Sequence, residues 1–173
     1  EGSEIKRHDD CATTNGTSIK VKNLFYNVPA RRNFLKSDAV EMRHITEEFT
    51  RLALANPEIK MQLFHNNNEL FHLSKGNFRQ RIVNIIGGKK NETLVPIEEE
   101  TSVVNIDGFI GKPEAAKRTR GEQYFFVNGR FIKNHYLHHA VSKAFEDLIP
   151  SNYFPSYFIN LKIDPKLIDI NIH

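Results

Sequence analysis

Residues 123–127 constrain the fold of this chain more than any other segment. They read Gln-Tyr-Phe-Phe-Val, so a strand here is apolar on both of its faces. Such a strand is typical of the interior of a sheet that is covered on both sides. Asn128-Gly129 follows at once, and this dipeptide is a strong signal for a tight turn. The sequence therefore predicts a central buried strand flanked by helices.

The remaining patterns predict helices, hairpins and strands in an irregular order. Helices are expected to begin at Asp38, Asn77 and Asn134, where a capping side chain precedes apolar residues spaced three or four apart. The third helix should carry Leu148 inward and end at Pro150. A hairpin is expected over 60–74, and strands are expected over 18–22, 102–110 and 157–163, with a last strand through Ile168, Ile170 and Ile172. Because strands and helices do not alternate regularly, the expected fold class is α+β.

Two segments between these elements are interpreted as loops. Residues 23–32 read as a structured loop in which Pro29 fixes one backbone angle. The run Glu98-Glu99-Glu100 reads as a solvated loop.

The composition suits a globular chain and excludes two other classes. Hydrophobic residues make up 39% and charged residues 26% of the 173 residues, which is too apolar for a disordered chain. No apolar stretch approaches the ~20 residues that a membrane-spanning helix needs. The formal charge of +3 hints only weakly at an anionic partner. The single cysteine, Cys11, favours a reducing compartment.

The sequence contains no self-contained catalytic site. It lacks a glycine-rich phosphate loop, a nucleophile elbow and a metalloprotease motif. His135, His138 and His139 have spacings that would suit a metal ion, but a solvated helix end explains them more simply. We therefore expect no catalytic residue and no metal site.

Two basic clusters suggest contacts with phosphates. The first is Arg31-Arg32, which follows Pro29-Ala30. The second contains Lys117, Arg118 and Arg120 before the central strand, with Arg130 and Lys133 after its turn. If these side chains converge, they would bind nucleic acid in a salt-sensitive and sequence-independent way. The alternative is ordinary surface charge.

Three blocks along the chain resemble, in the same order, the signature of the MutL family of DNA mismatch repair proteins. The first is Gly16-Thr17-Ser18-Ile19-Lys20-Val21 with Asn23-Leu24-Phe25-Tyr26-Asn27-Val28-Pro29-Ala30-Arg31-Arg32-Asn33-Phe34-Leu35, in which Asn33 replaces the usual lysine. The second is Gln123-Tyr124-Phe125-Phe126-Val127-Asn128-Gly129-Arg130. The third is Asp164-Pro165 with Asp169-Ile170-Asn171-Ile172-His173. Together they cover nearly the whole chain.

The resemblance implies a two-lobed architecture. Residues 1–76 would be the C-terminal part of a GHKL ATPase α/β sandwich, and residues 77–173 would be a truncated ribosomal protein S5 domain 2-like transducer lobe. Most of the family's ATP site lies outside these motifs, so we expect a fragment cut at both ends that is not itself an enzyme. ATP and Mg would be cofactors of the parent protein, a GHKL-type ATPase, and no cofactor is expected in the fragment.

The resemblance also assigns site residues. Gly16 and Thr17 match the last nucleotide-lobe motif. A loop between the lobes would contain Asn27, Pro29, Arg31 and Arg32. The family's DNA groove receives basic residues after the tight turn, so the expected DNA-binding set is Lys117, Arg118, Arg120, Arg130, Lys133 and His135, although His135 is a weaker cation than that position favours.

The function implied is coupling. The transducer would link ATP binding and homodimerisation of the parent to double-stranded and mismatched DNA and to a mismatch-recognition protein of the MutS type, with no membrane involved. The expected location is cytoplasmic and nucleoid-associated in a bacterium, or nuclear in a eukaryote. Two alternatives are the S5-like lobe of a gyrase-type GHKL ATPase and a free S5-like nucleic-acid-binding module.

Overall fold

The computed structural model describes residues 4–5, 8–10, 12 and 14–168. These residues form two compact units, Glu1–Glu41 and Met42–His173. Cys11 and the end of the expected last strand, Ile170 and Ile172, lie outside the described residues. None of the described helices is long and apolar enough to cross a membrane.

In the first unit the prediction of a strand over 18–22 is wrong. These residues are exposed and have no strand geometry. A strand is stabilised by hydrogen bonds to a neighbouring strand, and the described residues of this unit contain none. The segment 23–32 is more ordered than a loop, because helix α1 (Pro29–Asn33) begins inside it, with Pro29 at a favourable first position.

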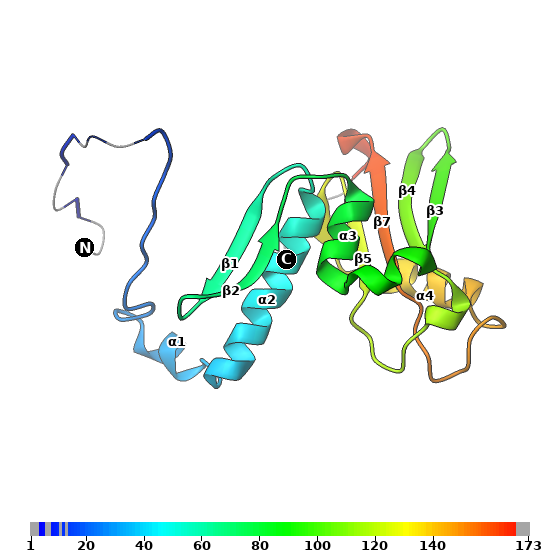
Figure 1. The fold of residues 1–173 in the computed structure, drawn as a ribbon, viewed down its shortest axis with the longest axis horizontal. Helices are drawn as coiled ribbons and strands as arrows, with labels where there is room; N and C mark the ends of the chain where they lie inside the picture. The colour runs from blue at the N-terminus through cyan, green and yellow to red at the C-terminus, as the bar shows by residue number, and fades with distance from the viewer. Residues whose placement is uncertain (1–3, 6–7, 11, 13, 169–173) are drawn as a thin grey trace. The chain divides into compact units, whose positions relative to one another are not determined.

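The second unit is built on a five-stranded sheet in the order β3-β4-β7-β5-β6 (Figure 1). The parallel pair joins β5 to β7, and every other neighbouring pair is antiparallel. The strands are β3 (Leu94–Glu100), β4 (Val104–Gly111), β5 (Gln123–Val127), β6 (Arg130–Ile132) and β7 (Tyr157–Ile163). The strand predicted from its two apolar faces is therefore internal, although β7 occupies the centre. The α+β prediction is confirmed.

Helices cover both faces of this sheet. On one face Leu54 of α2 (Asp38–Ala55) and Ile82 of α3 (Phe78–Ile86) pack with Phe126 and Phe158. On the other face α4 (His135–Ala144) lies over a second cluster formed around Phe125, Tyr157, Ile159 and Leu161. The alternation of side chains along β5 and β7 divides the core in this way.

Short-range signals placed the helix starts and the hairpins correctly. Asn77 caps α3 in a capping box with Gln80, and Asn134 caps α4 by accepting from two backbone amides. The hairpin over 60–74 is confirmed as β1 (Met61–His65) and β2 (Asn68–Leu73).

The turn between β5 and β6 is held from a distant part of the chain. Asn128 and Gly129 have φ values of 48° and 77°, as a primed turn requires. The Asn128 side chain donates to the Ile163 carbonyl at 2.8 Å and accepts from the Ile163 amide at 3.0 Å. The side chain thereby ties the turn to the end of β7.

Two predictions in the second unit are wrong. The glutamates from Glu98 to Glu100 belong to edge strand β3, because their backbone pairs with β4 while their side chains remain in solvent. Helix α4 ends at Ala144, and Leu148 is 59% exposed and does not point inward. Leu148 continues the apolar spacing of Val141 and Ala144 along the sequence, but the helix has already ended at Ala144.

A buried arginine joins α3 to the hairpin. Arg81 is 1% exposed, and its Nη2 donates to the carbonyl oxygens of Pro57 at 2.8 Å, Ile59 at 2.6 Å and Ser74 at 3.2 Å. The expected boundary between lobes at residue 76 therefore lies inside the second compact unit. Arg81, after this boundary, contacts Pro57, Ile59 and Ser74, which precede it.

Candidate nucleic-acid interface

The strand directions bring two sequence-distant basic segments to one end of the sheet. β5 begins where β6 ends, so residues 117–121 and 133–135 meet there; we call this the Gln123 end of the sheet. An open groove of about 970 Å³ lies at this end. The predicted DNA-binding residues among those lining it are Arg120, Lys133 and His135.

The arginines before β5 are fixed by aromatic rings. The Arg120 guanidinium lies 4.6 Å from the centre of the Phe154 ring. Arg118, just outside the groove lining, donates to the Tyr153 hydroxyl at 3.1 Å. Stacking of this kind orders an arginine while it keeps its charge available to an anion. Both guanidinium groups are therefore ordered and keep their positive charge.

Helix α2 supplies a cation that sequence reasoning missed. The Arg51 guanidinium lies 4.5 Å from the centre of the Phe131 ring, on the groove wall opposite α4. It also pairs with Glu47 at 3.8 Å and with Glu48. These two acids offset its charge. Glu146 also lines the groove and pairs with Lys143, so Arg120 and Lys133 carry the positive excess of the groove.

The histidines of α4 play different roles. His138 hydrogen-bonds through Nδ1 to the hydroxyl of buried Tyr157, and its ring lies 5.5 Å from that of Phe125. Burial and the nearby His135 and Arg120 lower the pKa of His138, so it remains neutral at pH 7. His135 is exposed at the groove. No three histidine, cysteine or carboxylate side chains among the described residues are grouped to hold a metal ion.

Lys117 does not line the groove and is held in an ion pair with Glu122. Its ammonium pairs with the Glu122 carboxylate, which also accepts from Lys90 at 2.6 Å and from the Ser156 hydroxyl at 2.8 Å. Burial alone would raise the pKa of Glu122, but the hydrogen bonds from Lys117, Lys90 and Ser156 together lower it below its usual value. We call this cluster the Glu122 tie.

Replacing Glu122 with glutamine is expected to destabilise the chain by about 2 kcal/mol at neutral pH, because hydrogen bonds to a charged group are lost. A carboxylate with a lowered folded-state pKa stabilises the fold above the unfolded pKa of about 4.3 and loses this effect as pH falls through the folded value. The difference between the two chains should therefore shrink on acidification. Urea unfolding between pH 7 and 3 measures the difference in unfolding free energy between the two chains. A difference that does not change with pH would contradict the prediction. Glu114→Gln is the control, because Glu114 is exposed.

Arg130 lies at the opposite end of the sheet. It pairs with Val127 at the turn of the β5–β6 hairpin, so the length of β6 separates it from Lys133. The structure does not bring this predicted DNA-binding residue into the groove.

The residues assigned to the nucleotide lobe lie in the first unit. Gly16 and Thr17 are exposed, and no atom lies within 4 Å of a Cβ built on Gly16. Asn27 precedes α1, and Arg31 and Arg32 occupy the last turn of this helix with exposed side chains. Their roles in nucleotide binding and between lobes remain predictions.

Comparison with known sequences decides the family. The model of a family described as "DNA mismatch repair protein, C-terminal domain" matches residues 82–173. The chain belongs to the MutL family of DNA mismatch repair proteins. It is 64% identical to MutL of Christiangramia forsetii and 58% identical to MutL of Flavobacterium psychrophilum, over 100% of this chain and 28% of each relative. The chain thus spans about a quarter of the length of these curated MutL proteins.

Solved MutL structures share the fold. The Aquifex aeolicus MutL ATPase domain complexed with ADP superposes with a TM-score of 0.65 at 26% identity, covering 84% of this chain and 52% of that one. The N-terminal domain of a DNA repair protein gives a TM-score of 0.73 at 18% identity, over 84% of this chain and 49% of that one. The comparison supports the MutL interpretation and not the gyrase-type alternative.

The MutL chain contains site residues that no linear pattern reveals. Arg51 reaches the groove from a helix more than sixty residues before Lys133. Arg81 is buried and Glu122 is largely buried, and only the packing of the folded chain shows that these charged residues are shielded from solvent. Arg81 follows Arg79 and Gln80 in the sequence, so no local signal distinguishes it as buried.

Proposed function

We propose that this MutL segment couples the nucleotide state of a longer ATPase to the binding of duplex DNA. The groove at the Gln123 end of the sheet is the observation that carries the proposal. It combines cations from two loops with the first turn of α4 on a rigid sheet, so an anion bound there contacts several elements at once. Phosphates are the anions that such a surface meets in a DNA repair protein.

The longer protein would supply the parts that this segment lacks. We infer that the parent is a GHKL-type ATPase that uses ATP and Mg and forms a homodimer, and that Gly16 and Thr17 contribute to the base of its nucleotide pocket. The segment itself would not hydrolyse ATP. Arg31 and Arg32 would lie between the lobes. The similarity to MutL proteins supports a role in mismatch repair. Such a role suggests a mismatch-recognition partner of the MutS type and a location in the bacterial cytoplasm near the nucleoid.

The DNA proposal predicts distinct effects for neighbouring lysines and arginines. Arg120→Ala and Lys133→Ala should each weaken duplex binding and lower the salt slope, d log K/d log[salt], by about 0.9 in magnitude, since each removes one phosphate contact. Lys117→Ala should lower the thermal stability and leave the slope nearly unchanged, because its ammonium is held by Glu122. Fluorescence anisotropy from 50 to 200 mM salt measures binding, and circular dichroism measures folding.

The controls distinguish a local site from general charge loss. Lys166 is exposed and follows β7 at the end of the sheet opposite to the groove. Lys166→Ala removes the same charge and should leave the slope unchanged. Arg130→Ala tests whether the opposite end contributes. An equal loss of affinity in Arg120→Ala, Lys133→Ala, Lys166→Ala and Arg130→Ala would refute the groove as the binding site, as would the absence of binding by the unmodified chain at low salt.

A further inference from the structure

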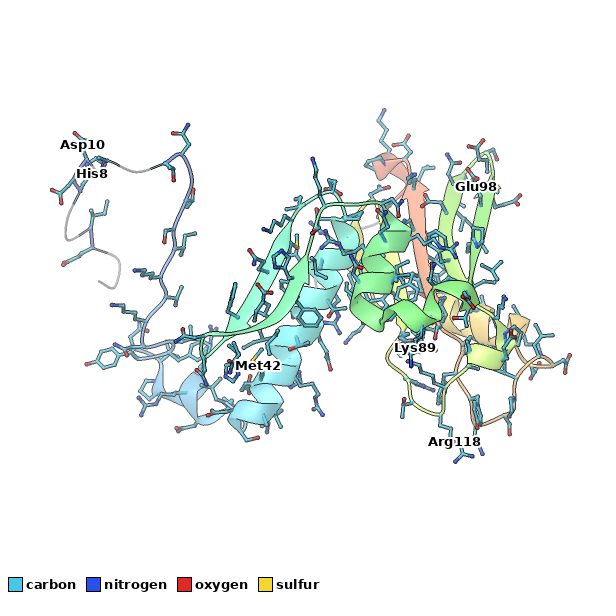
Figure 2. All side chains as sticks on the ribbon, in the orientation of Figure 1. His8, Asp10, Met42, Lys89, Glu98 and Arg118 are labelled. Atoms are coloured by element: carbon cyan, nitrogen blue, oxygen red, sulfur yellow. The ribbon has the colours of Figure 1, made fainter. Side chains whose placement is uncertain are left out.

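Exposed cations continue beyond the groove toward strand β3. Residues 88–93 and 111–122 contain six lysines and arginines and three glutamates, whereas residues 98–105 contain three glutamates and no cation. The first two segments lie at the Gln123 end of the sheet, and the third lies at the opposite end. Figure 2 shows Lys89 and Arg118 toward the lower end of the sheet and Glu98 near the upper end of β3. Along β3 and β4 the two ends therefore differ in charge, although Arg130, Lys162 and Lys166 offset part of the negative charge at the opposite end.

The Glu122 tie holds the two basic segments together. Lys90 comes from the short helix η1 (Gly88–Thr93), and Lys117 comes from the loop before β5. Both ammonium groups contact the same carboxylate oxygen, so these segments are neighbours. The backbone amide of Lys112 also donates to the Thr93 carbonyl at 2.8 Å. Lys89 and Lys112 are exposed beside these fixed contacts.

We propose that Lys89 and Lys112 form a second set of phosphate contacts, continuous with the groove, on which the same duplex DNA lies. This inference rests on the proposed function and extends its site to residues that no motif singled out. We call Lys89 and Lys112 the η1 ridge. Their charges are not consumed by the Glu122 tie, which uses Lys90 and Lys117 instead.

The width of the sheet matches a stretch of duplex. Four inter-strand spacings of ~4.8 Å separate β3 from β6, which is ~19 Å in total. Duplex DNA carries one charge per ~1.7 Å of its axis, so this span presents about eleven phosphates. The exposed cations along it are Lys89, Lys112, Arg118, Arg120 and Lys133. Three exposed acids, Glu92, Glu114 and Glu146, lie among them and leave a positive excess.

The chemistry of this surface favours DNA over a protein partner. The core of a protein–protein interface is enriched in aromatic and apolar residues. None of the large apolar side chains that are exposed in the described residues falls within 88–93 or 111–121. A surface that offers charge without apolar anchors fits a regular polyanion.

The test is the double variant Lys89→Ala with Lys112→Ala in the 173-residue chain, with Lys166→Ala as the matched control. Binding of a fluorescent 25-base-pair duplex is measured by anisotropy from 50 to 200 mM salt, and circular dichroism confirms folding. We expect the double variant to lower the magnitude of the salt slope by about 1.8 and the affinity at 0.1 M salt by roughly tenfold or more. Lys166→Ala should match the unmodified chain.

The outcomes separate this inference from the proposed function. If Arg120→Ala and Lys133→Ala weaken binding while the double variant keeps the full slope, the η1 ridge is refuted and the groove stands. If the unmodified chain fails to bind DNA, both fail. If the double variant loses binding to poly-glutamate but keeps DNA binding, the η1 ridge serves an acidic protein and the inference is wrong.

Discussion

Replacing Gly108 with alanine destabilises the chain by about 3 kcal/mol or more, the cost of backbone strain combined with overpacking in a sheet. Gly108 lies in β4 between Ile97 and Ile159 of the two neighbouring strands. A Cβ at this position would stand 2.1 Å from the Phe158 carbonyl oxygen, and the φ angle of 150° is one that side chains disfavour. The obstacle is backbone, so no rotamer change relieves it, and β4 would have to separate from β7.

Gly88→Ala provides the control for this prediction. No atom lies within 4 Å of a Cβ at Gly88, and its φ is not in the left-handed region, so we expect a change within about 0.5 kcal/mol. Urea unfolding followed by circular dichroism measures both variants, and a collapse of Gly108→Ala to an insoluble product also supports the prediction. Equal midpoints for Gly108→Ala and the unmodified chain would show that the sheet tolerates a side chain there.

Replacing Arg81 with alanine is expected to cost about 3–5 kcal/mol, because several hydrogen bonds from a charged group are lost and each contributes about 1.5–3 kcal/mol. Three carbonyl oxygens from the hairpin side would lose their donor. Burial lowers the pKa of Arg81, but an arginine remains charged at neutral pH. Its contribution is therefore the hydrogen bonding of a buried cation to backbone carbonyl groups.

Two further variants test this explanation of Arg81. Arg81→Met keeps most of the side-chain volume without donors, so a loss close to that of alanine would assign the effect to the carbonyl groups. Arg79→Met on the same helix removes partly exposed hydrogen bonds to Asn91 and should cost about 1 kcal/mol. If Arg81→Met is as stable as the unmodified chain, the cavity and not the hydrogen bonding explains the alanine result. Chemical unfolding midpoints provide the comparison.

Local signals determined which parts of the fold were predictable. Helix starts at Asn77 and Asn134 depend on a side chain and the next few amides, so they can be read from adjacent residues. Strand β3 could not be read this way, because its outer glutamates break any apolar alternation and its stability comes from pairing with β4. The segment 18–22 has the opposite problem, since it alternates well but has no partner among the described residues.

The sequence predicted which segments supply the basic residues of the candidate site, but not how their side chains are arranged in the fold. The order of the basic residues identified both loops, and the directions of β5 and β6 then selected Lys133 over Arg130. Neither the pairing of Lys117 with Glu122 nor the approach of Arg51 from α2 has a local cause. Both depend on contacts between residues far apart in the sequence, which only the folded chain specifies.

The hydrogen bonds between the Asn128 side chain and the Ile163 backbone also affect how readily Asn128 deamidates. An asparagine followed by glycine is prone to deamidation, in which the glycine backbone nitrogen attacks the side-chain amide carbon and expels ammonia. Water then opens the resulting succinimide to aspartate or isoaspartate. Here both polar atoms of the Asn128 carboxamide are engaged by Ile163, which restricts the rotation that the attack needs. Conversion to aspartate would replace a donor with a negative charge facing the Ile163 carbonyl. Deamidation at this turn should therefore accompany opening of the β7 end, so the accumulation of aspartate at position 128 would record how often that end opens.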